Sequence, residues 1–297
     1  MGNPRAIRIG EHIGSRIDGI RLGGDLADED IAFIRATLLE RKVVFFRDQH
    51  DLDDAAHQEF GRRLGDLGAV HLNDPSAHVA AIDSEHGGKA NWWHTDITFS
   101  ERPPAGAILR AVQLPDFGGT TIWANTAAAY AQLPAELRRL ADALWAVHDN
   151  SAFRDDLSPE QARAARDHPD TAAFYAKLTA QTIAAEHPVV HVHPETGERC
   201  LLLGVYARRI SGYDREDSDA LLHLFQRRIT RPELTVRWDW QPGDVVIWDN
   251  RATQHYAVSD YAEQKRLMRR VVLTGGVPES ITGERSRSGV DLAAARG

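Results

Sequence analysis

The sequence predicts a mainly β fold with flanking helices, of the antiparallel barrel or jelly-roll kind. Several short segments carry apolar residues at every second position, which is typical of strands. Fewer segments show the three-to-four-residue spacing of amphipathic helices. These helices do not alternate with the strands one by one, as a parallel doubly wound sheet requires. We therefore expect an antiparallel barrel or jelly roll braced by helices.

The elements can be assigned in chain order. The patterns predict helices around residues 31–38, 137–144 and 221–229, and strands at residues 42–46, 188–192, 235–240, 244–248 and 269–273. Residues 155–186 are rich in alanine and lack strand character, so we expect a helical insertion there, either a lid or a plain excursion. The chain is polar from residue 282, and we expect a frayed tail at the end of a single domain that spans residues 1–297.

Composition excludes several classes of protein. Hydrophobic residues make up 42% of the 297 residues, so a disordered chain is excluded. A single cysteine, Cys200, excludes a disulfide scaffold and a multi-cysteine metal site, and favours the reducing cytoplasm. The net charge of -8 offers no electrostatic basis for binding nucleic acid or an anionic membrane. No apolar run approaches the roughly 18 residues of a membrane span.

The most informative motif is a histidine and an aspartate spaced two residues apart. On an extended strand, His94 and Asp96 would point to the same side and could bind one metal ion. A third ligand is available in His255, which follows a strongly apolar strand. Two histidines and one carboxylate on one face of an octahedron leave three positions open, as in non-haem Fe(II) oxygenases, whereas a structural zinc site is closed and tetrahedral.

Two arginines follow the third candidate ligand. Arg266 and Arg270 could be surface residues, but cations beside a divalent metal are costly unless anions separate them. A dicarboxylate co-substrate could do this through a bidentate guanidinium contact. His191 and His193 share the spacing of metal ligands, yet they adjoin a polar Pro-Glu-Thr-Gly-Glu turn with no third ligand, so we do not expect a second metal site there.

These residues resemble a known family, the taurine dioxygenase (TauD/TfdA) family of Fe(II)/2-oxoglutarate-dependent dioxygenases. The resemblance extends from about residue 13 to residue 277, and the alkyl sulfatase branch looks most similar. It implies a double-stranded β-helix, a cupin-like jelly roll with two sheets around the metal. The stretches that carry it are His94-Thr95-Asp96, Gly118 to Trp123, Trp248 to Ala257, and Arg266 with Arg270, together with Trp123 to Tyr130 and His187 to Arg199 for the branch.

The resemblance also implies a role for each matching residue. His94, Asp96 and His255 would bind Fe(II) as the catalytic metal site. Thr121 and Arg266 would bind the carboxylates of 2-oxoglutarate, which is a co-substrate together with O2. The residues implied for the primary substrate are Arg270, which would hold its anionic group, His71, Tyr206 and Trp248.

The expected reaction is hydroxylation of the carbon next to the heteroatom of a small anionic substrate. An alkyl sulfate ester or a sulfonate would release an aldehyde plus sulfate or sulfite, with succinate and CO2 as co-products. Where taurine dioxygenase has an asparagine that contacts substrate, this chain has Ala90 followed by Asn91 and Trp92, which argues against taurine itself. Alternatives are the same chemistry on an aryloxy or aliphatic carboxylate or a natural-product intermediate, and a non-catalytic anion-binding jelly roll. The family also implies a homodimer or homotetramer.

Overall fold

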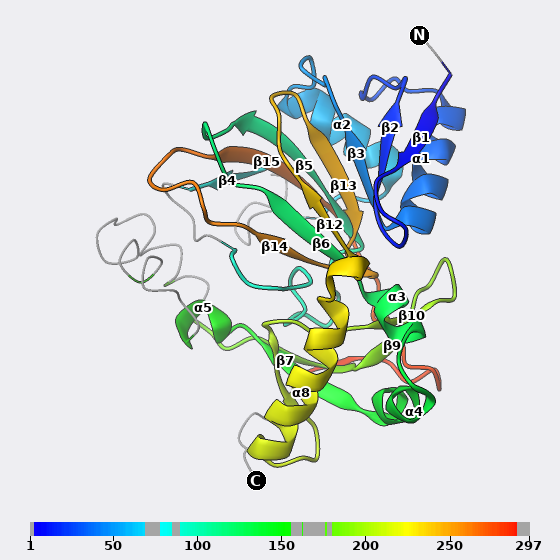
Figure 1. The fold of residues 1–297 in the computed structure, drawn as a ribbon, viewed down its shortest axis with the longest axis vertical. Helices are drawn as coiled ribbons and strands as arrows, with labels where there is room; N and C mark the ends of the chain where they lie inside the picture. The colour runs from blue at the N-terminus through cyan, green and yellow to red at the C-terminus, as the bar shows by residue number, and fades with distance from the viewer. Residues whose placement is uncertain are drawn as a thin grey trace.

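The computed structural model describes residues 3–68, 78–84, 90–155, 162, 176 and 180–289. Figure 1 shows a large sheet with helices α1 and α2 beside it at the N-terminal end, and a second region built around α4 and α8 at the other end. In the described part of the chain, no helix is long and apolar enough to cross a membrane.

The largest sheet has seven strands in the order β1-β2-β3-β13-β5-β15-β4. All of its strand pairs are antiparallel except β2 with β3. The strands are β1 (Arg5–Arg8), β2 (Ser15–Asp18), β3 (Val43–Phe46), β4 (Ala80–Asp83), β5 (Gly106–Gln113), β13 (Val245–Asp249) and β15 (Leu267–Leu273).

The central strands of this sheet are buried on both faces. Val44 and Phe46 of β3 point to helices α1 (Asp28–Arg41) and α2 (Asp54–Leu64), in a core that includes Ile34 and Phe60. The intervening residue Phe45 points to the opposite face, because successive side chains alternate along a strand. Burial on both faces explains why these strands are continuous apolar runs in the sequence.

A second sheet covers that opposite face. It has three antiparallel strands in the order β12-β6-β14, namely β12 (Thr235–Trp238), β6 (Thr121–Asn125) and β14 (Thr253–Ala257). Phe45 of the large sheet stacks on Trp238 of the small sheet, with ring centroids 4.2 Å apart. The two sheets therefore form a sandwich, the architecture that the sequence predicts.

A separate apolar core lies at the other end of the molecule. It involves three helices and two further sheets, with the strand orders β11-β7-β8-β16 and β10-β9. The helices are α3 (Thr126–Ala131), α4 (Ala135–Ala143) and α8 (Arg215–Ile229), and the strands are β7 (Trp145–Asp149), β8 (Ala184–Pro188), β9 (Val190–Val192), β10 (Arg199–Leu201), β11 (Ala207–Ile210) and β16 (Arg287–Ser288). The described residues also include two short helical segments, α5 (Ala152–Asp155) and the 3-10 helix η1 (Pro232–Leu234).

Two sequence-based boundaries differ from the structure. The predicted insertion at residues 155–186 lies mostly outside the described residues, but its last part belongs to β8, which begins at Ala184. The frayed tail predicted from residue 282 is wrong for Arg287 and Ser288, which pair with β8. Residues 290–297 lie outside the described part of the chain.

Candidate active site

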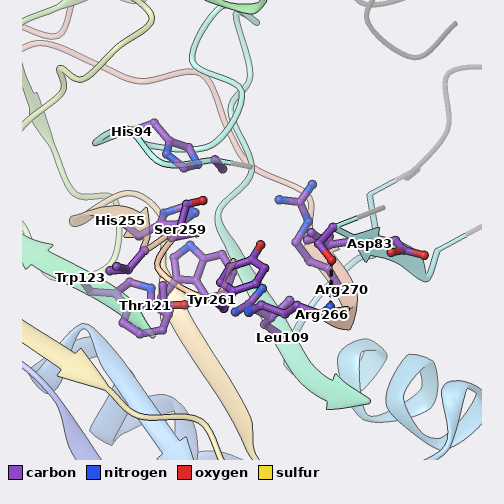
Figure 2. A pocket seen from close by; sticks show the side chains of 16 residues that line it. Asp83, His94, Leu109, Thr121, Trp123, His255, Ser259, Tyr261, Arg266 and Arg270 are labelled. Carbon is purple, nitrogen blue, oxygen red and sulfur yellow. Dashed lines mark hydrogen bonds between the residues drawn. The ribbon is translucent and has the colours of Figure 1, made fainter. Parts of the chain in front are cut away.

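A cavity of about 80 Å³ lies among β4, β5, β6, β13, β14 and β15. Figure 2 shows His94 and His255 on one side of it and Arg270 on the other. Strand periodicity explains the inward direction of Arg270, because Met268 and Val272, two positions away on either side, both belong to the core between the two sheets. The cavity is lined by Ile82, Asp83, Ser84, Ala90, His94, Leu109, Thr121, Trp123, Trp248, His255, Ala257, Val258, Ser259, Tyr261, Arg266 and Arg270.

The structure brings the three predicted metal ligands together. One ligand atom from each of His94, Asp96 and His255 lies within 4.8 Å of the other two. The Asp96 carboxylate oxygen Oδ1 is 3.7 Å from His94 Nε2 and 3.9 Å from His255 Nε2. His94 Nδ1 donates to the carbonyl of Trp92 at 2.9 Å, which leaves Nε2 unprotonated and directed towards the other two ligands. Among the described residues this is the one cluster of at least three potential ligands.

The expectation that His94 and Asp96 share an extended strand is wrong. His94 forms a single antiparallel bridge with His255, and Asp96 begins a turn. The next residue, Ile97, has a φ of 54°, in the left-handed region that strands do not use. The turn nevertheless brings the carboxylate to the two imidazoles.

Electrostatics keep all three groups in the form that binds a metal. Burial lowers the pKa of His94, and it lowers the pKa of His255 to about 3. Burial alone would raise the pKa of Asp96, but Arg270 and the two neighbouring imidazoles together outweigh it, so this pKa lies below its usual value. Neutral imidazoles and an ionised carboxylate are suitable ligands for a divalent metal, and Asp96 Oδ2 is buried without a hydrogen-bond partner. The residues therefore fit a metal ion.

Arg266 enters the cavity beside a double-glycine turn. Its Nε donates to the carbonyl of Gly119 at 3.2 Å, and a side chain at Gly119 would approach the Arg266 guanidinium to about 3.3 Å. Both Gly118 and Gly119 have positive φ, so the turn needs glycine at these positions. Arg266 Nη2 is buried without a hydrogen-bond partner, and burial lowers the pKa of the guanidinium. Such a group is suited to an anion from outside the protein.

Thr121, the first residue of β6, lines the same cavity and is oriented by a tryptophan. Trp240 Nε1 donates to Thr121 Oγ1 at 3.0 Å, so the threonine proton is free to donate to another acceptor. The indole of Trp240 also lies 5.9 Å from the Arg266 guanidinium carbon. Trp240 alternates with Trp238 along the chain, a pattern that indicates core residues and gives no sign of a role in the site, and both are indeed buried.

The residues predicted for the primary substrate have different outcomes. Arg270 and Trp248 both line the cavity; Arg270 Nη1 donates to Asp96 at 3.2 Å, and the Trp248 ring lies 4.9 Å from His255. Tyr206 is not among the lining residues. It packs edge-on against the far side of His94 because it belongs to an aromatic cluster with Phe99. His71 lies outside the described residues.

The second histidine pair is not in a polar surface turn. His191 and His193 are buried, and each makes an internal hydrogen bond. His191 Nε2 contacts the carbonyl of Arg251 at 2.7 Å, and His193 Nε2 contacts the Asp249 carboxylate at 2.9 Å. The neighbouring polar turn does not reveal this burial, because the partners Asp249, at the end of β13, and Arg251, just after it, are more than 50 residues away in sequence.

Fold and site together define a class of protein: a jelly roll with a two-histidine, one-carboxylate cluster that can hold a metal ion, beside the buried Arg266 and the half-buried Arg270. The model of the family described as "Taurine catabolism dioxygenase TauD, TfdA family" matches residues 7–272, and the chain belongs to this family. It is an alpha-ketoglutarate-dependent dioxygenase, an oxidoreductase that uses 2-oxoglutarate, O2 and a metal. The resemblance and the fold class predicted from the sequence are confirmed.

Individual relatives agree with this assignment. The chain is 45% identical to an alpha-ketoglutarate-dependent sulfate ester dioxygenase of Pseudomonas putida, over 96% of each chain. It is 42% identical to an alkylsulfatase of Acinetobacter baylyi, over 93% of this chain and 86% of the relative. The crystal structure of a taurine dioxygenase from Burkholderia xenovorans superposes with a TM-score of 0.79 at 34% identity, covering 99% of each chain.

Proposed function

We propose that this enzyme uses Fe(II) and hydroxylates the carbon next to the heteroatom of a small anionic substrate, an alkyl sulfate ester first and a sulfonate second. Two relatives that match at 45% and 42% identity are named for sulfate esters and alkyl sulfates. A more distant relative of Saccharomyces cerevisiae, 30% identical, is named for sulfonates. These degrees of identity support the order in which we place the two substrate classes.

The observation that carries the proposal is the number of cations in one cavity. Arg266 and Arg270 both line the cavity that holds His94 and His255. Arg266 Nη2 and Arg270 Nε are buried without hydrogen-bond partners. One ligand anion can pair with each guanidinium: a carboxylate of 2-oxoglutarate and the anionic group of the primary substrate.

The residue roles follow from these positions. Arg266 and the Thr121 hydroxyl hold a 2-oxoglutarate carboxylate, while Arg270 anchors the substrate anion. His94, Asp96 and His255 would hold Fe(II), which supplies the oxidation of a C–H bond by O2 with 2-oxoglutarate as reductant. Trp248 and Trp123 form an apolar wall that keeps water away from the ligands. By fixing the anion, Arg270 selects the adjacent carbon for reaction.

The overall reaction balances. An alkyl sulfate, O2 and 2-oxoglutarate give the hydroxylated ester, succinate and CO2, with one oxygen atom entering the substrate and the other entering succinate. The hydroxylated ester is a hemiacetal derivative whose C–O bond to sulfate breaks as the hydroxyl loses its proton. The products are an aldehyde and sulfate, whereas a sulfonate breaks at its C–S bond and yields sulfite.

The test is a product screen. Succinate, aldehyde, sulfate and sulfite are measured separately with an alkyl sulfate, the matching sulfonate, an aryloxyacetate and the parent alcohol. We expect the sulfate ester to raise succinate and aldehyde formation together and the alcohol to raise neither, because it offers Arg270 no anion. Arg270→Ala should keep slow succinate formation but lose aldehyde. Faster turnover of the aryloxyacetate would move the substrate class to carboxylates.

One control variant accompanies the screen. His255→Ala should abolish substrate-dependent succinate formation, and activity near that of the wild type would remove His255 from the metal site.

Size-exclusion chromatography with light scattering tests the expected homodimer or homotetramer. The cytoplasmic location rests on the single cysteine, and fractionation of cells that express the protein tests it.

A further inference from the structure

The three metal-site residues are held in place in different ways. His94 and His255 fix each other through a pair of backbone hydrogen bonds: His94 N donates to His255 O at 3.0 Å, and His255 N donates to His94 O at 2.8 Å. Asp96 has no such pairing with a neighbouring strand among the described residues, since it begins a turn. Apart from the contact of the Asp96 carboxylate with Arg270, its position therefore depends on the contacts that hold that turn.

The backbone of this turn has an unfavourable conformation. Ile97, directly after Asp96, has a φ of 54°, and a β-branched residue is disfavoured in the left-handed region. Such a conformation persists only where the surroundings impose it. The contacts that impose this conformation lie on either side of Ile97.

On one side, the side chain of Asn250 binds both backbone groups of Asp96. Asn250 Oδ1 accepts from Asp96 N at 2.9 Å, and its Nδ2 donates to Asp96 O at 3.2 Å and to Pro104 O at 2.9 Å. Asn250 is only 1% exposed. A carboxamide has both the acceptor and the two donors that this arrangement uses, so no other residue type of the same size can replace it.

On the other side, two buried histidines hold Thr98. The carbonyl of Thr98 can only accept, so His187 carries its proton on Nε2 and donates to that carbonyl at 2.7 Å. His187 Nδ1 lies 2.7 Å from Ser286 Oγ. His148 Nδ1 lies 2.9 Å from Thr98 Oγ1, and both histidines are 0% exposed. None of these side chains lines the cavity, so they act on the site through the turn.

We propose that Asn250 and His187 are positioning residues that clamp the turn on either side of Ile97 and thereby hold the Asp96 carboxylate at the metal site. Without either contact, the turn moves towards a relaxed backbone conformation, and the carboxylate leaves the two imidazoles, which stay paired with each other. The inference rests on the proposed function, because it takes Asp96 to be a metal ligand.

The experiment measures binding of Mn(II) to the metal-free protein by calorimetry, together with the visible spectrum of bound Co(II). Asn250→Ala and His187→Leu should each weaken Mn(II) binding by about 10- to 100-fold, the usual effect of removing a group that orients a metal ligand. Both should change the Co(II) spectrum, since a displaced carboxylate alters the coordination. His187→Gln retains an N–H donor of similar reach and should recover most of the affinity.

Two comparisons separate this role from a general effect on folding. His57→Leu removes an equally buried histidine from α2 and should leave Mn(II) affinity unchanged. Thermal unfolding of each metal-free variant shows that it is folded. Asn250→Asp keeps the acceptor but loses the donor, and it replaces Asn250→Ala if that variant does not fold. Mn(II) affinity within twofold of the wild type in folded Asn250 and His187 variants would overturn the proposal, as would an equal loss in His57→Leu.

A reference variant distinguishes the failure of this inference from the failure of the proposed metal site. Asp96→Ala should abolish specific Mn(II) binding. If it binds Mn(II) as the wild type does, Asp96 is not a ligand and the metal site itself is wrong. If Asp96→Ala loses Mn(II) while Asn250→Ala and His187→Leu do not, the metal site stands and only the clamp is wrong.

Discussion

Arg251 and Arg266 are both held within the protein, yet their surroundings are opposite. Arg251 donates from Nε and Nη2 to the two oxygens of Asp249, at 2.9 and 2.8 Å, and from Nη1 to Glu195 at 2.7 Å. These partners hold the pKa of Arg251 above its usual value, although burial alone would lower it. Arg266 is 7% exposed and forms no ion pair within the described part of the chain, and burial lowers its pKa.

This difference shows which buried charge serves the structure and which serves a ligand. A buried guanidinium that has its own carboxylates is part of the folded framework. A buried guanidinium without one is costly in the free protein, and a ligand anion can remove that cost. Charge alone would not have separated the two residues, whereas their hydrogen-bond partners do. Matched substitutions should therefore have opposite consequences.

The largest effect is expected on stability when the paired arginine is replaced. Arg251→Met keeps most of the apolar stem but leaves the buried Asp249 carboxylate with His193 Nε2 as its remaining side-chain hydrogen-bond partner. The free energy of unfolding in urea should fall by about 3 to 5 kcal/mol, the usual result of breaking a buried ion pair. The dissociation constant for 2-oxoglutarate, measured with Mn(II) present, should stay within about threefold of the wild type. Similar stability in both proteins would show that the Asp249 pair is not structural.

Replacement of the unpaired arginine should have the reverse effect. Arg266→Met should weaken 2-oxoglutarate binding by about 2 to 4 kcal/mol, or about 30- to 1,000-fold, because a charge-assisted contact to a carboxylate is lost. Stability of the ligand-free protein should stay the same or increase, since an uncompensated buried charge is removed. Calorimetry gives the affinity and urea unfolding gives the stability. Unchanged affinity would transfer the co-substrate role to another residue, with Arg270 next.

Lowering the pH tests the role of Arg251 in a different way. Arg251 and His193 together hold the pKa of Asp249 well below its usual value, although burial alone would raise it. The stability from Asp249 is therefore present above its unfolded pKa of about 4 and is lost as the pH falls towards the folded value. In Arg251→Met the pKa of Asp249 should be higher than in the wild type. The difference in free energy of unfolding between the two proteins should therefore shrink below pH 4, by up to about 1.4 kcal/mol per pH unit. Urea unfolding from pH 5 to pH 3 measures this difference, and a difference that stays constant with pH would contradict the Arg251–Asp249 ion pair.

The smallest effect is expected at the tryptophan that supports the unpaired arginine. Trp240→Phe retains an aromatic ring but loses the indole N–H that donates to Thr121. Loss of one hydrogen bond is worth about 1 kcal/mol, so 2-oxoglutarate affinity should fall about fivefold. Trp238→Phe is the matched control, because its indole donates to Asp244 and not to the site. An equal loss in the control would show that the effect comes from packing.

The sequence predicted the sheet residues of the site better than the turn residues. Arg270 could be placed because it lies on a strand, where alternation with apolar neighbours decides its direction. The direction of Asp96 could not be derived, since alternation predicts a strand where the chain forms a left-handed turn at Ile97. Strand alternation depends only on neighbouring residues. The turn is instead held by hydrogen bonds from Asn250 and His187, both about 90 or more residues away in sequence.

The sequence by itself determined the fold class, because the alternation of apolar residues is a local property of the chain, and it offered His94, Asp96, His255 and Arg266 as candidates for the site. The tertiary structure alone decided which buried charges have internal partners. Arg251 is paired and Arg266 is not, and no pattern within either segment distinguishes them. The physical reason is that desolvation acts on every buried charge, whereas compensation requires a partner of opposite charge, and only the folded chain determines which partners come within reach.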